Sequence, residues 1–360
     1  MNKSRSLRML YITQAIDKNF DLLAPFYKWL NLLAKKFVKI DAVCLQEGRH
    51  DDLAGNIEVK SLGKEKGVSK LGYILNFYKY CAPLIITRKI DLIFVHMNEL
   101  YVFMLWPLAV IFRIPMVIWR AHGRTNWQVK LVTKLLSGIA TSSETGYSII
   151  TPKRHIIGQG VDLDHFPVKS EYPETVEKLI WVGRISRIKN LETLVKATEI
   201  LVKKEKLEIK LEIIGQAPDQ NGADYLEEIK QMIVDLGLNG NFVFSGNINH
   251  DFLPAKYREA DVFINTSDTG SLDKTVLEAM ATGLFVINSN YGFNGILADF
   301  PECRFKQGDY QDLANKLKYV FSLTADQRKT LGKSLRGIVA KDHALDSFID
   351  RLYKVLIEKC

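Results

Sequence analysis

The sequence predicts an α/β protein built from two doubly wound domains. Short apolar segments with the length of buried strands alternate along the chain with longer, helix-like segments, a pattern typical of βαβ units and of parallel sheets covered on both faces. The chain has 360 residues, which exceeds one ordinary core and suits two domains of about 170 residues each. Between Phe166 and Lys178, two prolines and clustered charges interrupt the alternation and indicate a linker.

This linker divides the predicted elements into two sets. We expect a first domain over residues 1–168, a second over residues 174–342, and a C-terminal helix over residues 344–360 that packs back toward the first domain. In the first domain each strand is a short aliphatic run, and each helix shows apolar residues at helical spacing. The predicted order is strand Leu7–Thr13, helix Phe20–Lys39, strand Ala42–Leu45, helix Lys70–Arg88, strand Asp91–His96, helix Leu100–Phe112, strand Met116–Trp119, helix Trp127–Leu136 and strand Ile139–Thr141.

The second domain repeats the alternation. Its first helix carries five aliphatic residues on one face, which is the pattern of a helix packed on a sheet. The predicted order is strand Leu179–Val182, helix Leu191–Lys203, strand Lys210–Ile214, helix Ala223–Leu236, strand Phe242–Ser245, helix Pro254–Ala260, strand Val262–Asn265, helix Lys274–Ala281 and strand Phe285–Ile287.

The composition is that of a folded protein from a reducing compartment. Hydrophobic residues make up 47% of the chain and charged residues 25%. The four cysteines form no Cys-x-x-Cys pair, so neither a disulfide framework nor a zinc site is expected. The N-terminal apolar run is too short for a signal peptide, and Pro107, Arg113 and Pro115 interrupt the apolar segment from Leu100 to Trp119 that resembles a membrane span. We therefore expect a cytoplasmic protein.

The excess of positive charge lies entirely in the first half. Residues 1–170 contain 24 Lys and Arg against 13 Asp and Glu, a balance of +11, whereas residues 171–360 contain 25 against 28, a balance of −3. This asymmetry favours an extended anionic partner, either a bilayer surface or nucleic acid. The predicted helix Phe20–Lys39 mixes aromatic and aliphatic residues with lysines, as an amphipathic helix on lipid headgroups does. The pattern equally fits a helix packed on its own sheet, which we favour for the apolar face.

Two segments of the second half point to a phosphate ligand. The strand Leu179–Val182 ends at Gly183, and Arg184 and Lys189 follow before a helix begins. Free backbone N–H groups and the helix dipole favour an anion at such a helix start. A second polar cluster, residues 268–283, lies about ninety positions further on. Together the two segments predict a site for a nucleoside diphosphate carrying a sugar.

Two histidines of the first half close predicted strands. His96 ends one strand and His122 follows another, and Gly123 next to His122 allows close approach of a ligand or another backbone. In a pair of facing doubly wound domains, ligands bind at the carboxyl ends of the strands, in the central cleft. Each histidine is therefore a candidate for chemistry, and the alternative is a histidine that is hydrogen-bonded within its loop.

Six short motifs follow one another along the chain. They are Ile114-Pro115 leading to Arg120-Ala121-His122-Gly123, Ala140-Thr141-Ser142-Ser143-Glu144, Gly158-Gln159-Gly160-Val161-Asp162, Gly183-Arg184 with Lys189-Asn190, Tyr257-Arg258-Glu259-Ala260-Asp261-Val262-Phe263 and Leu277-Glu278-Ala279-Met280-Ala281-Thr282-Gly283. In this order they resemble the retaining glycosyltransferases of family 4, which have the GT-B fold of two facing Rossmann-like domains. The resemblance covers most of the chain and is strongest from Met116 to Ile287.

The resemblance implies roles for particular residues. Arg184 and Lys189 would hold the donor diphosphate and neutralise the departing nucleotide in place of a metal ion, Glu278 would accept hydrogen bonds from the ribose, and His122 would lie beside the reacting sugar. The alternative for Glu278 is a carboxylate that only complements a helix dipole. The implied donor-binding set is Gly183, Arg184, Lys189, Gly270, Ser271, Leu272, Asp273, Lys274, Thr275 and Glu278, and the acceptor-side candidates are Gln14, Asp17, His96 and Asn98.

The chain departs from the family pattern at two positions. Gly270 stands where the family usually places a glutamate that contacts the donor sugar, so Asp268, Asp273 or backbone N–H groups of residues 270–272 would take over. The loop after the first strand lacks the usual glycines, and Asp17 there is either an acceptor contact or, as we favour, a cap of the next helix. Asp162-Leu163-Asp164 matches a metal-binding pattern of another glycosyltransferase fold, but its place in a turn indicates a structural role.

The predicted function is that of a metal-independent retaining glycosyltransferase. It would move a hexose from a nucleoside-diphosphate sugar, with no other cofactor, to a glycan or lipid-linked acceptor in cell-surface polysaccharide or glycoconjugate synthesis, as a peripheral protein at the inner face of the membrane. A GT-B nucleotide-sugar epimerase or phosphorylase would share the phosphate-binding segments. A nucleic-acid-binding protein is disfavoured because no recognised motif accompanies the charge, and an NAD-dependent oxidoreductase because no Gly-x-Gly-x-x-Gly follows the first strand.

Overall fold

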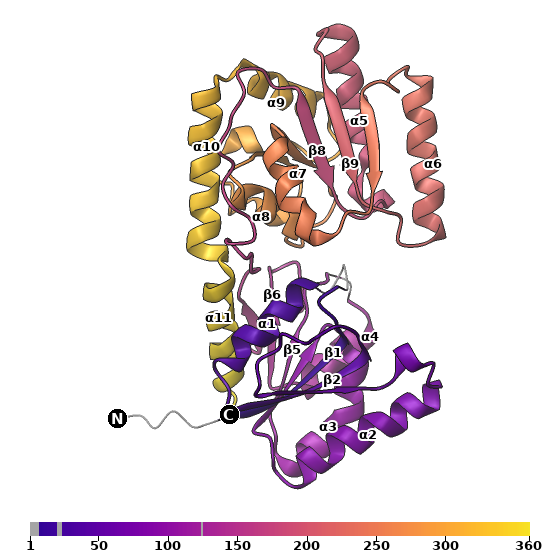
Figure 1. Cartoon of the computed structure of the whole chain (residues 1–360), viewed down its shortest axis with the longest axis vertical. Coiled ribbons are helices and arrows are strands. Elements are labelled where there is room, and N and C mark those ends of the chain that lie inside the picture. Colours follow the sequence, from indigo (N-terminus) through magenta and orange to yellow (C-terminus); the bar gives the residue numbers. More distant parts are fainter. Residues whose placement is uncertain (1–6, 20–23, 124) are drawn as a thin grey trace. The chain divides into compact units, whose positions relative to one another are not determined.

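The computed structural model describes residues 7–19, 24–123 and 125–360, and the chain divides into two compact units. Unit 1 contains residues 1–158 together with residues 345–360, and unit 2 contains residues 159–344 (Figure 1). The first unit is therefore built from both ends of the chain, with the second unit inserted between them.

The boundary at Gly158 lies ahead of the linker that the prolines and charges predicted. The segment from Phe166 to Lys178 belongs to unit 2 because its side chains pack there. Phe166 is buried in the core of unit 2. The ammonium group of the buried Lys169 donates a hydrogen bond of 2.5 Å to the carbonyl of Ala260. The predicted domain boundaries at 168 and 174 are corrected accordingly.

Unit 1 contains one parallel sheet of seven strands in the order β3-β2-β1-β4-β5-β6-β7. The chain leaves β1 toward β2 on one side and returns to β4 on the other, so the order reverses between β1 and β4, which is where doubly wound sheets bind their ligands. The strands are β1 (Arg8–Ile16), β2 (Lys39–Glu47), β3 (Ile57–Ser61), β4 (Leu92–His96), β5 (Met116–Trp119), β6 (Gly138–Thr141) and β7 (Arg154–Ile156).

Both faces of this sheet are covered. Along β1, Met9 and Tyr11 belong to the hydrophobic cluster that includes residues of α1 and α11, whereas Leu10 and Ile12 belong to the cluster that includes residues of α2 and α3. Alternate side chains of a strand point to opposite faces, so this division places the two sets of helices on opposite sides of the sheet. The helices are α1 (Ala24–Ala34), α2 (Lys70–Ile86), α3 (Glu99–Phe112), α4 (Trp127–Leu135), α11 (Leu345–Ile357) and the short 3-10 helix η1 (Lys64–Lys66).

The first helix does not serve as a lipid-binding helix with an exposed apolar face. Residues 20–23 of the predicted helix lie outside the described residues, α1 ends at Ala34, and Lys39 already begins β2. Trp29 is buried and contacts Phe348 of α11, with ring centroids 4.4 Å apart. Leu30, Leu33 and Phe37 are buried in the same cluster. The alternative interpretation, a helix packed within its own domain, is confirmed.

Unit 2 contains a parallel sheet of five strands in the order β10-β9-β8-β11-β12, so its order reverses between β8 and β11. The strands are β8 (Lys178–Val182), β9 (Lys210–Ile214), β10 (Phe242–Gly246), β11 (Val262–Asn265) and β12 (Phe285–Asn288). The helices are α5 (Leu191–Glu199), α6 (Gln220–Asp235), α7 (Leu253–Glu259), α8 (Lys274–Ala281), α9 (Tyr310–Ser322), α10 (Ala325–Ile338), the π-helices η3 (Ile200–Lys204) and η7 (Val339–His343), and the 3-10 helices η2 (Arg187–Lys189), η4 (His250–Phe252), η5 (Tyr291–Phe293) and η6 (Pro301–Cys303).

None of the helices in the described part of the chain combines the length and the apolar character that a membrane crossing requires.

Candidate functional site

The turn after β8 begins with two glycine backbones in contact. The N–H of Gly183 donates a hydrogen bond of 3.0 Å to the carbonyl of Ile214. Gly215 has a φ of +143°, and a Cβ built on it would lie 1.8 Å from the carbonyl oxygen of Gly183. Only glycine fits at position 215. The turn that carries Arg184 and Lys189 is thus fixed by a residue that the sequence analysis did not single out.

Arg184, the first residue after this glycine turn, is an exposed cation. Its guanidinium forms no hydrogen bond or ion pair within the described residues. Arg187, three positions later, differs because its guanidinium pairs with Glu228 at 2.5 Å and lies over the ring of Tyr225. At the carboxyl edge of β8, the charge of Arg184 is therefore not neutralised by a neighbouring carboxylate.

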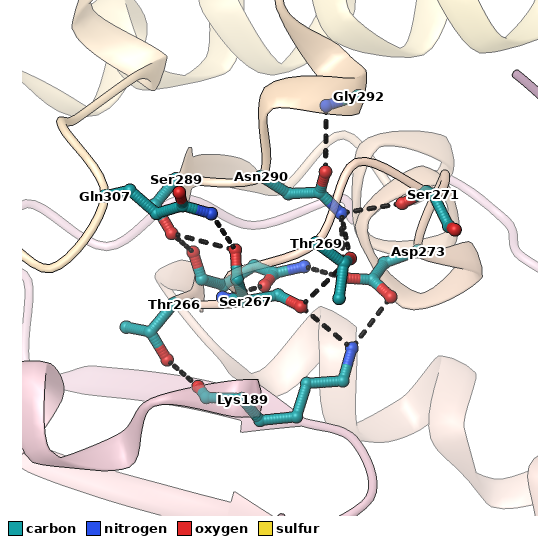
Figure 2. Close-up of polar contacts among 11 residues, drawn as sticks. Lys189, Thr266, Ser267, Thr269, Ser271, Asp273, Ser289, Asn290, Gly292 and Gln307 are labelled. Atoms are coloured by element: carbon teal, nitrogen blue, oxygen red, sulfur yellow. Dashed lines mark hydrogen bonds and ion pairs between the residues drawn. The ribbon is translucent and has the colours of Figure 1, made fainter. Parts of the chain in front are cut away.

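Lys189 is held by residues from the β11 edge. Its Nζ lies 2.7 Å from Oδ1 of Asp273 and 3.2 Å from Oγ of Ser267, and its carbonyl accepts a hydrogen bond of 2.6 Å from the hydroxyl of Thr266. Figure 2 shows the lysine side chain reaching into this group of polar residues. The ammonium group thus has a defined position beside the start of α8.

Asp273 is the ionised partner of Lys189. Its Oδ2 accepts hydrogen bonds from Asn265 at 2.9 Å and from Asn290 at 3.1 Å. Burial raises the pKa of the Asp273 carboxyl, but the charge of Lys189 and these hydrogen bonds outweigh burial and hold the pKa below its ordinary value. Asp273 occupies the N-cap position of α8, yet its side chain makes no capping hydrogen bond. Because the carboxylate turns to Lys189, it does not cap the N-terminus of α8, which is the end of a helix that favours an anion.

Asn290, which the sequence analysis missed, holds the loop before α8. Its carboxamide nitrogen donates to the carbonyl of Ser271 at 2.7 Å, to Oγ1 of Thr269 at 3.2 Å and to Asp273, and its oxygen accepts from the N–H of Gly292 at 2.9 Å (Figure 2). A Cβ built on Gly292 would lie 2.1 Å from the carbonyl oxygen of Gly270. The backbone around Gly270 is therefore fixed by the loop that follows β12.

Glu278 lies in the second turn of α8 and is 2% exposed. Its Oε1 is 3.0 Å from Nε2 of His250 and 3.8 Å from Nζ of Lys274, and its Oε2 accepts from the hydroxyl of Tyr257 at 3.4 Å. Burial raises the pKa of Glu278, but the hydrogen bond from His250 and the charge of Lys274 outweigh it, and the net pKa is lowered. A helix dipole acts mainly within the first turn, so this position disfavours the interpretation of Glu278 as a carboxylate that only complements the dipole.

The other predicted donor-binding residues of α8 and its loop differ in exposure. The side chain of Leu272 belongs to the hydrophobic core, so only its backbone is available to a ligand. Ser271 uses its carbonyl to accept from Asn290 and is half-buried, as are Lys274 and Thr275. These residues share the start of α8 with Asp273, so the structure brings the predicted residues 270–275 together at one helix N-terminus.

His96 of unit 1 is buried rather than exposed to a ligand. Its Nδ1 lies 3.1 Å from the hydroxyl of Thr13, and its Nε2 is buried with no hydrogen-bond partner among the described residues. The ring of Phe26 lies 4.3 Å away and that of Trp29 5.9 Å, measured between centroids. Burial lowers the pKa of His96 to about 3, so the ring is neutral at physiological pH. The interpretation of His96 as an accessible acceptor contact is therefore not supported.

The remaining acceptor-side candidates of unit 1 have structural partners. Oδ1 of Asp17 accepts from the N–H of Asn19 at 2.9 Å and of Arg49 at 3.1 Å, so it joins the loops after β1 and β2. Residues 20–23, between Asp17 and the first described residue of α1, lie outside the described part of the chain, so the expected cap stays a prediction. Asn98 caps α3 by accepting from the N–H of Leu100 at 2.9 Å. Gln14 is half-buried and lies near the side chain of Tyr101.

His122 is exposed in the loop after β5. The guanidinium of the buried Arg120 donates to the carbonyl of His122 and pairs with Glu99. A Cβ built on Gly123 would lie 2.7 Å from the carbonyl oxygen of Thr145, so glycine is required there. This loop is thus held in place by Arg120 while its histidine faces outward.

One group of described residues has metal-ligand chemistry, and its geometry does not fit a metal ion. His165, His250 and Asp251 bring candidate ligand atoms within 4.8 Å of one another. The two imidazole rings are stacked, with centroids 5.0 Å apart and planes 7° apart. An imidazole binds a metal through a lone pair in the plane of its ring, so stacked rings direct their lone pairs in parallel and not toward one ion. Oδ1 of Asp162 accepts from the N–H groups of Asp164 and His165, which supports the structural role predicted for that turn.

A family model described as "Glycosyl transferases group 1" matches residues 164–337, which lie within unit 2. Residues 164–337 therefore form a domain of this family. Its curated relatives include mannosylfructose-phosphate synthase of Agrobacterium fabrum, 26% identical over 148 residues, and α-monoglucosyldiacylglycerol synthase of Streptococcus pneumoniae, 28% identical over 166 residues. These matches cover 38% and 46% of this chain and 33% and 36% of the relatives, so the chain matches about a third of each relative's length.

Similar solved structures cover nearly the whole chain and show its fold. Sucrose-phosphate synthase from Thermosynechococcus elongatus matches with a TM-score of 0.79 and 18% identity, covering 98% of this chain and 100% of that chain. The protein HepE of Anabaena, solved in complex with UDP and glucose, matches with a TM-score of 0.74 and 16% identity, covering 98% of this chain and 99% of that chain. The chain therefore has the GT-B fold, an α/β fold with two parallel sheets.

The candidate site contains both predicted and unpredicted residues of unit 2. Lys189 and Asp273, both predicted, contact each other, and Glu278 contacts Lys274. The residues that sequence reasoning missed are Gly215, His250, Asn265, Ser267 and Asn290. Several of them follow the apolar runs of β11 and β12. The rule that drew attention to His96 and His122, a polar residue at the carboxyl end of a parallel strand, would have found them.

Proposed function

We propose that the chain is a retaining, metal-independent glycosyltransferase that moves a hexose from a nucleoside-diphosphate sugar to a glycan or lipid-linked acceptor. In this proposal it serves cell-surface polysaccharide or glycoconjugate synthesis. The observation that carries the proposal is the arrangement around β8 and α8: an exposed Arg184 without a carboxylate partner, a lysine fixed by Asp273, and a helix N-terminus whose N-cap carboxylate is turned away.

This arrangement suits the charge that develops when a glycosidic bond to a diphosphate breaks. Negative charge grows on the leaving phosphate while the sugar becomes oxocarbenium-like. Arg184 would form paired hydrogen bonds with phosphate oxygens, as guanidinium groups do. Lys189 would add a charge at a position fixed by Asp273, and the amides of α8 would complete the phosphate contacts. These groups supply the positive charge that a metal ion supplies in other enzymes.

The remaining roles are proposed from the family resemblance. Glu278 would accept hydrogen bonds from the ribose, and its carboxylate keeps acceptor capacity beyond His250 and Tyr257 because each oxygen can accept two. His122 of unit 1 would contact the reacting sugar. With Gly270 in place of a glutamate, the fixed backbone beside Asn290 would contact the sugar hydroxyls.

The acceptor and the location are proposed from charge and from the relatives. The balance of +11 in residues 1–170 favours a peripheral position at the cytoplasmic face of a membrane. The name of the Streptococcus pneumoniae relative denotes synthesis of a monoglucosyl diacylglycerol, which is a membrane lipid. A lipid-linked acceptor is consistent with both observations.

A panel of UDP-, GDP- and ADP-sugars tests the proposal. One nucleotide class should raise the melting temperature, because a ligand at a hundred times its Kd stabilises a fold by about 2.7 kcal/mol. The same donor should be hydrolysed slowly without acceptor, and an NMR assignment of the glycosylated product should show the anomeric configuration of the donor. If the sugar is altered while it remains on the nucleotide, the enzyme is an epimerase. If no nucleotide sugar binds, the proposal fails.

A further inference from the structure

Helix α3 has the composition of a buried helix but one exposed face. After Glu99 in its first turn, no charged residue occurs up to Phe112. A helix that is apolar on all sides is normally enclosed by protein or lipid. In unit 1 one side of α3 packs through buried Tyr101, Val102 and Leu105, whereas the other side leaves four large apolar side chains exposed, namely Leu100, Trp106, Val110 and Ile111.

Helix α2 continues this apolar surface. It exposes Leu71, Ile74, Leu75 and Tyr78 at the spacing i, i+3, i+4 and i+7, which places them on one face of the helix. Leu71 is 67% exposed and Leu75 is 64% exposed. Single exposed leucines are ordinary, but a set on one helix face marks an interaction site.

The two helices are adjacent and directly bonded. The rings of Phe77 and Tyr101 are stacked with centroids 5.6 Å apart, and the hydroxyl of Tyr78 donates to the carbonyl of Met104 at 3.0 Å. Figure 1 shows α2 and α3 side by side in unit 1. We call the eight exposed apolar residues named above the α2–α3 face.

Cations occur along α2 and next to both helices in the sequence. Residues 60–89 contain seven Lys or Arg and a single acidic residue, Glu65. Six exposed cations near α2 and α3 form no ion pair within the described residues: Lys64, Lys70, Lys79, Arg88, Lys89 and Arg113. An apolar helix surface bordered by unpaired cations matches the boundary between anionic headgroups and acyl chains.

We infer that the α2–α3 face docks unit 1 onto an anionic lipid bilayer, with its apolar side chains among the acyl chains and its lysines at the lipid phosphates. The inference rests on the proposed function and names the surface that its membrane partner contacts. A second copy of this chain is a poorer occupant, because a two-fold contact brings the same patch of both copies together and would oppose the unpaired cations.

Flotation with vesicles tests the inference. The full chain is mixed with phosphatidylcholine vesicles that contain 30% phosphatidylglycerol, at low and high salt. Wild type should float with the vesicles at low salt and be largely released at high salt. Lys64→Gln with Lys70→Gln should weaken binding about twenty-five-fold, since each cation near an anionic surface contributes about a factor of five. Leu71→Asn with Leu75→Asn should abolish flotation at moderate salt.

Two matched controls lie on unit 2. Lys329→Gln with Lys333→Gln removes two exposed lysines of α10, and Val234→Asn replaces an exposed valine of α6 that is 51% exposed. Both should float as wild type does. Because the substituted residues are exposed and lie outside the candidate site, hydrolysis of the nucleotide sugar without vesicles should stay within twofold of wild type for all variants. This assay distinguishes failure of docking from failure of the proposed chemistry.

Three results would overturn the inference. Wild type that ignores the anionic vesicles even at low salt excludes the membrane as occupant. Equal losses for the α2 variants and the unit 2 controls show that general charge, and not this face, binds lipid. A concentration-dependent dimer in sedimentation that Leu71→Asn with Leu75→Asn dissociates, without vesicle binding, assigns the face to a second copy.

Discussion

Lys189 and Asp273, 84 positions apart in the sequence, form an ion pair of 2.7 Å that joins the turn after β8 to the start of α8. Arg184, in the same turn, has no such partner within the described residues. Of the two cations proposed to hold the diphosphate, only Lys189 therefore contributes an ion pair to the fold. We expect the stability of the two alanine variants to differ for this reason.

Arg184→Ala and Lys189→Ala should each lower kcat/KM about thirtyfold to a thousandfold. This corresponds to a loss of about 2–4 kcal/mol of transition-state stabilisation. Only Lys189→Ala should also destabilise the protein, on the order of 3 kcal/mol, because it leaves the Asp273 carboxylate without its counter-charge. Urea unfolding and initial rates measure both effects. Lys189→Ala combined with Asp273→Asn should recover stability but not activity. Two single variants with rates within twofold of wild type would refute the assignment.

Removal of metal ions should leave the rate unchanged. The proposed positive charge comes from Arg184, Lys189 and the amides of α8, so EDTA treatment and dialysis should not alter initial rates. Added manganese or magnesium should have no more effect than an equal ionic strength of sodium chloride. Strict dependence on a divalent cation would contradict this reading of the site.

Asn290→Ala should raise the donor KM about tenfold with a smaller change in kcat. The substitution removes the carboxamide that fixes Thr269, Ser271 and Asp273, and a lost buried hydrogen bond costs about 1–3 kcal/mol. Asn294→Ala, an exposed asparagine four positions later, is the matched control. An unchanged KM would show that the loop keeps its conformation without Asn290.

Because of the buried His96, the free energy of unfolding should decrease as the pH falls below about 6.5. Burial lowers its folded-state pKa to about 3, whereas an unfolded histidine titrates near 6.5, so between these values the unfolded state binds the additional proton. This stabilising contribution is complete above pH 6.5 and falls as pH decreases toward 3. Between pH 6.5 and 5 the free energy of unfolding should drop by about 2 kcal/mol more in wild type than in His96→Asn. Urea titrations at the two pH values measure it, with His50→Asn as control.

His122→Ala should reduce sugar transfer at least a hundredfold, as expected for a lost catalytic contact, and leave nucleotide affinity nearly unchanged. The reason is that His122 belongs to unit 1, whereas the proposed diphosphate contacts belong to unit 2. Isothermal titration with the nucleoside diphosphate and a transfer assay separate the two effects. A parallel loss of nucleotide affinity would place His122 at the nucleotide and not at the sugar.

Most buried elements could be predicted from the sequence because their local pattern is unambiguous. The bounds of β5, β9, β11 and α8 coincide with the predicted ones. The missed strands β3 and β7 lie at the edges of the unit 1 sheet, where half-exposed residues weaken the apolar signal. Helix α10 was missed although its capping box, Thr324 with Gln327, is visible in the sequence.

The site was predictable to the extent that it follows strand ends. The glycine and cations after β8 are a local signal, and so are the polar residues after β12 that include Asn290. That Asp273 would turn away from capping α8 toward Lys189 depends on a contact between distant segments, which no local pattern contains. His96 illustrates the same limit, because the side chains that bury it come from α1.

The division of unit 1 between the two ends of the chain has a consequence for biosynthesis. Phe348 of α11 fills the space beside Trp29 and Trp119, with ring centroids 4.4 and 5.2 Å away. On the ribosome, residues 159–344 emerge as one continuous segment and have all the strands of their own sheet before residues 345–360 are made. Unit 1 cannot complete its core, and its two tryptophans stay uncovered by Phe348, until α11 has left the exit tunnel. Unit 1, most of which is translated first, is therefore the unit that completes its folding last. We expect nascent-chain chaperones to bind its exposed apolar side chains.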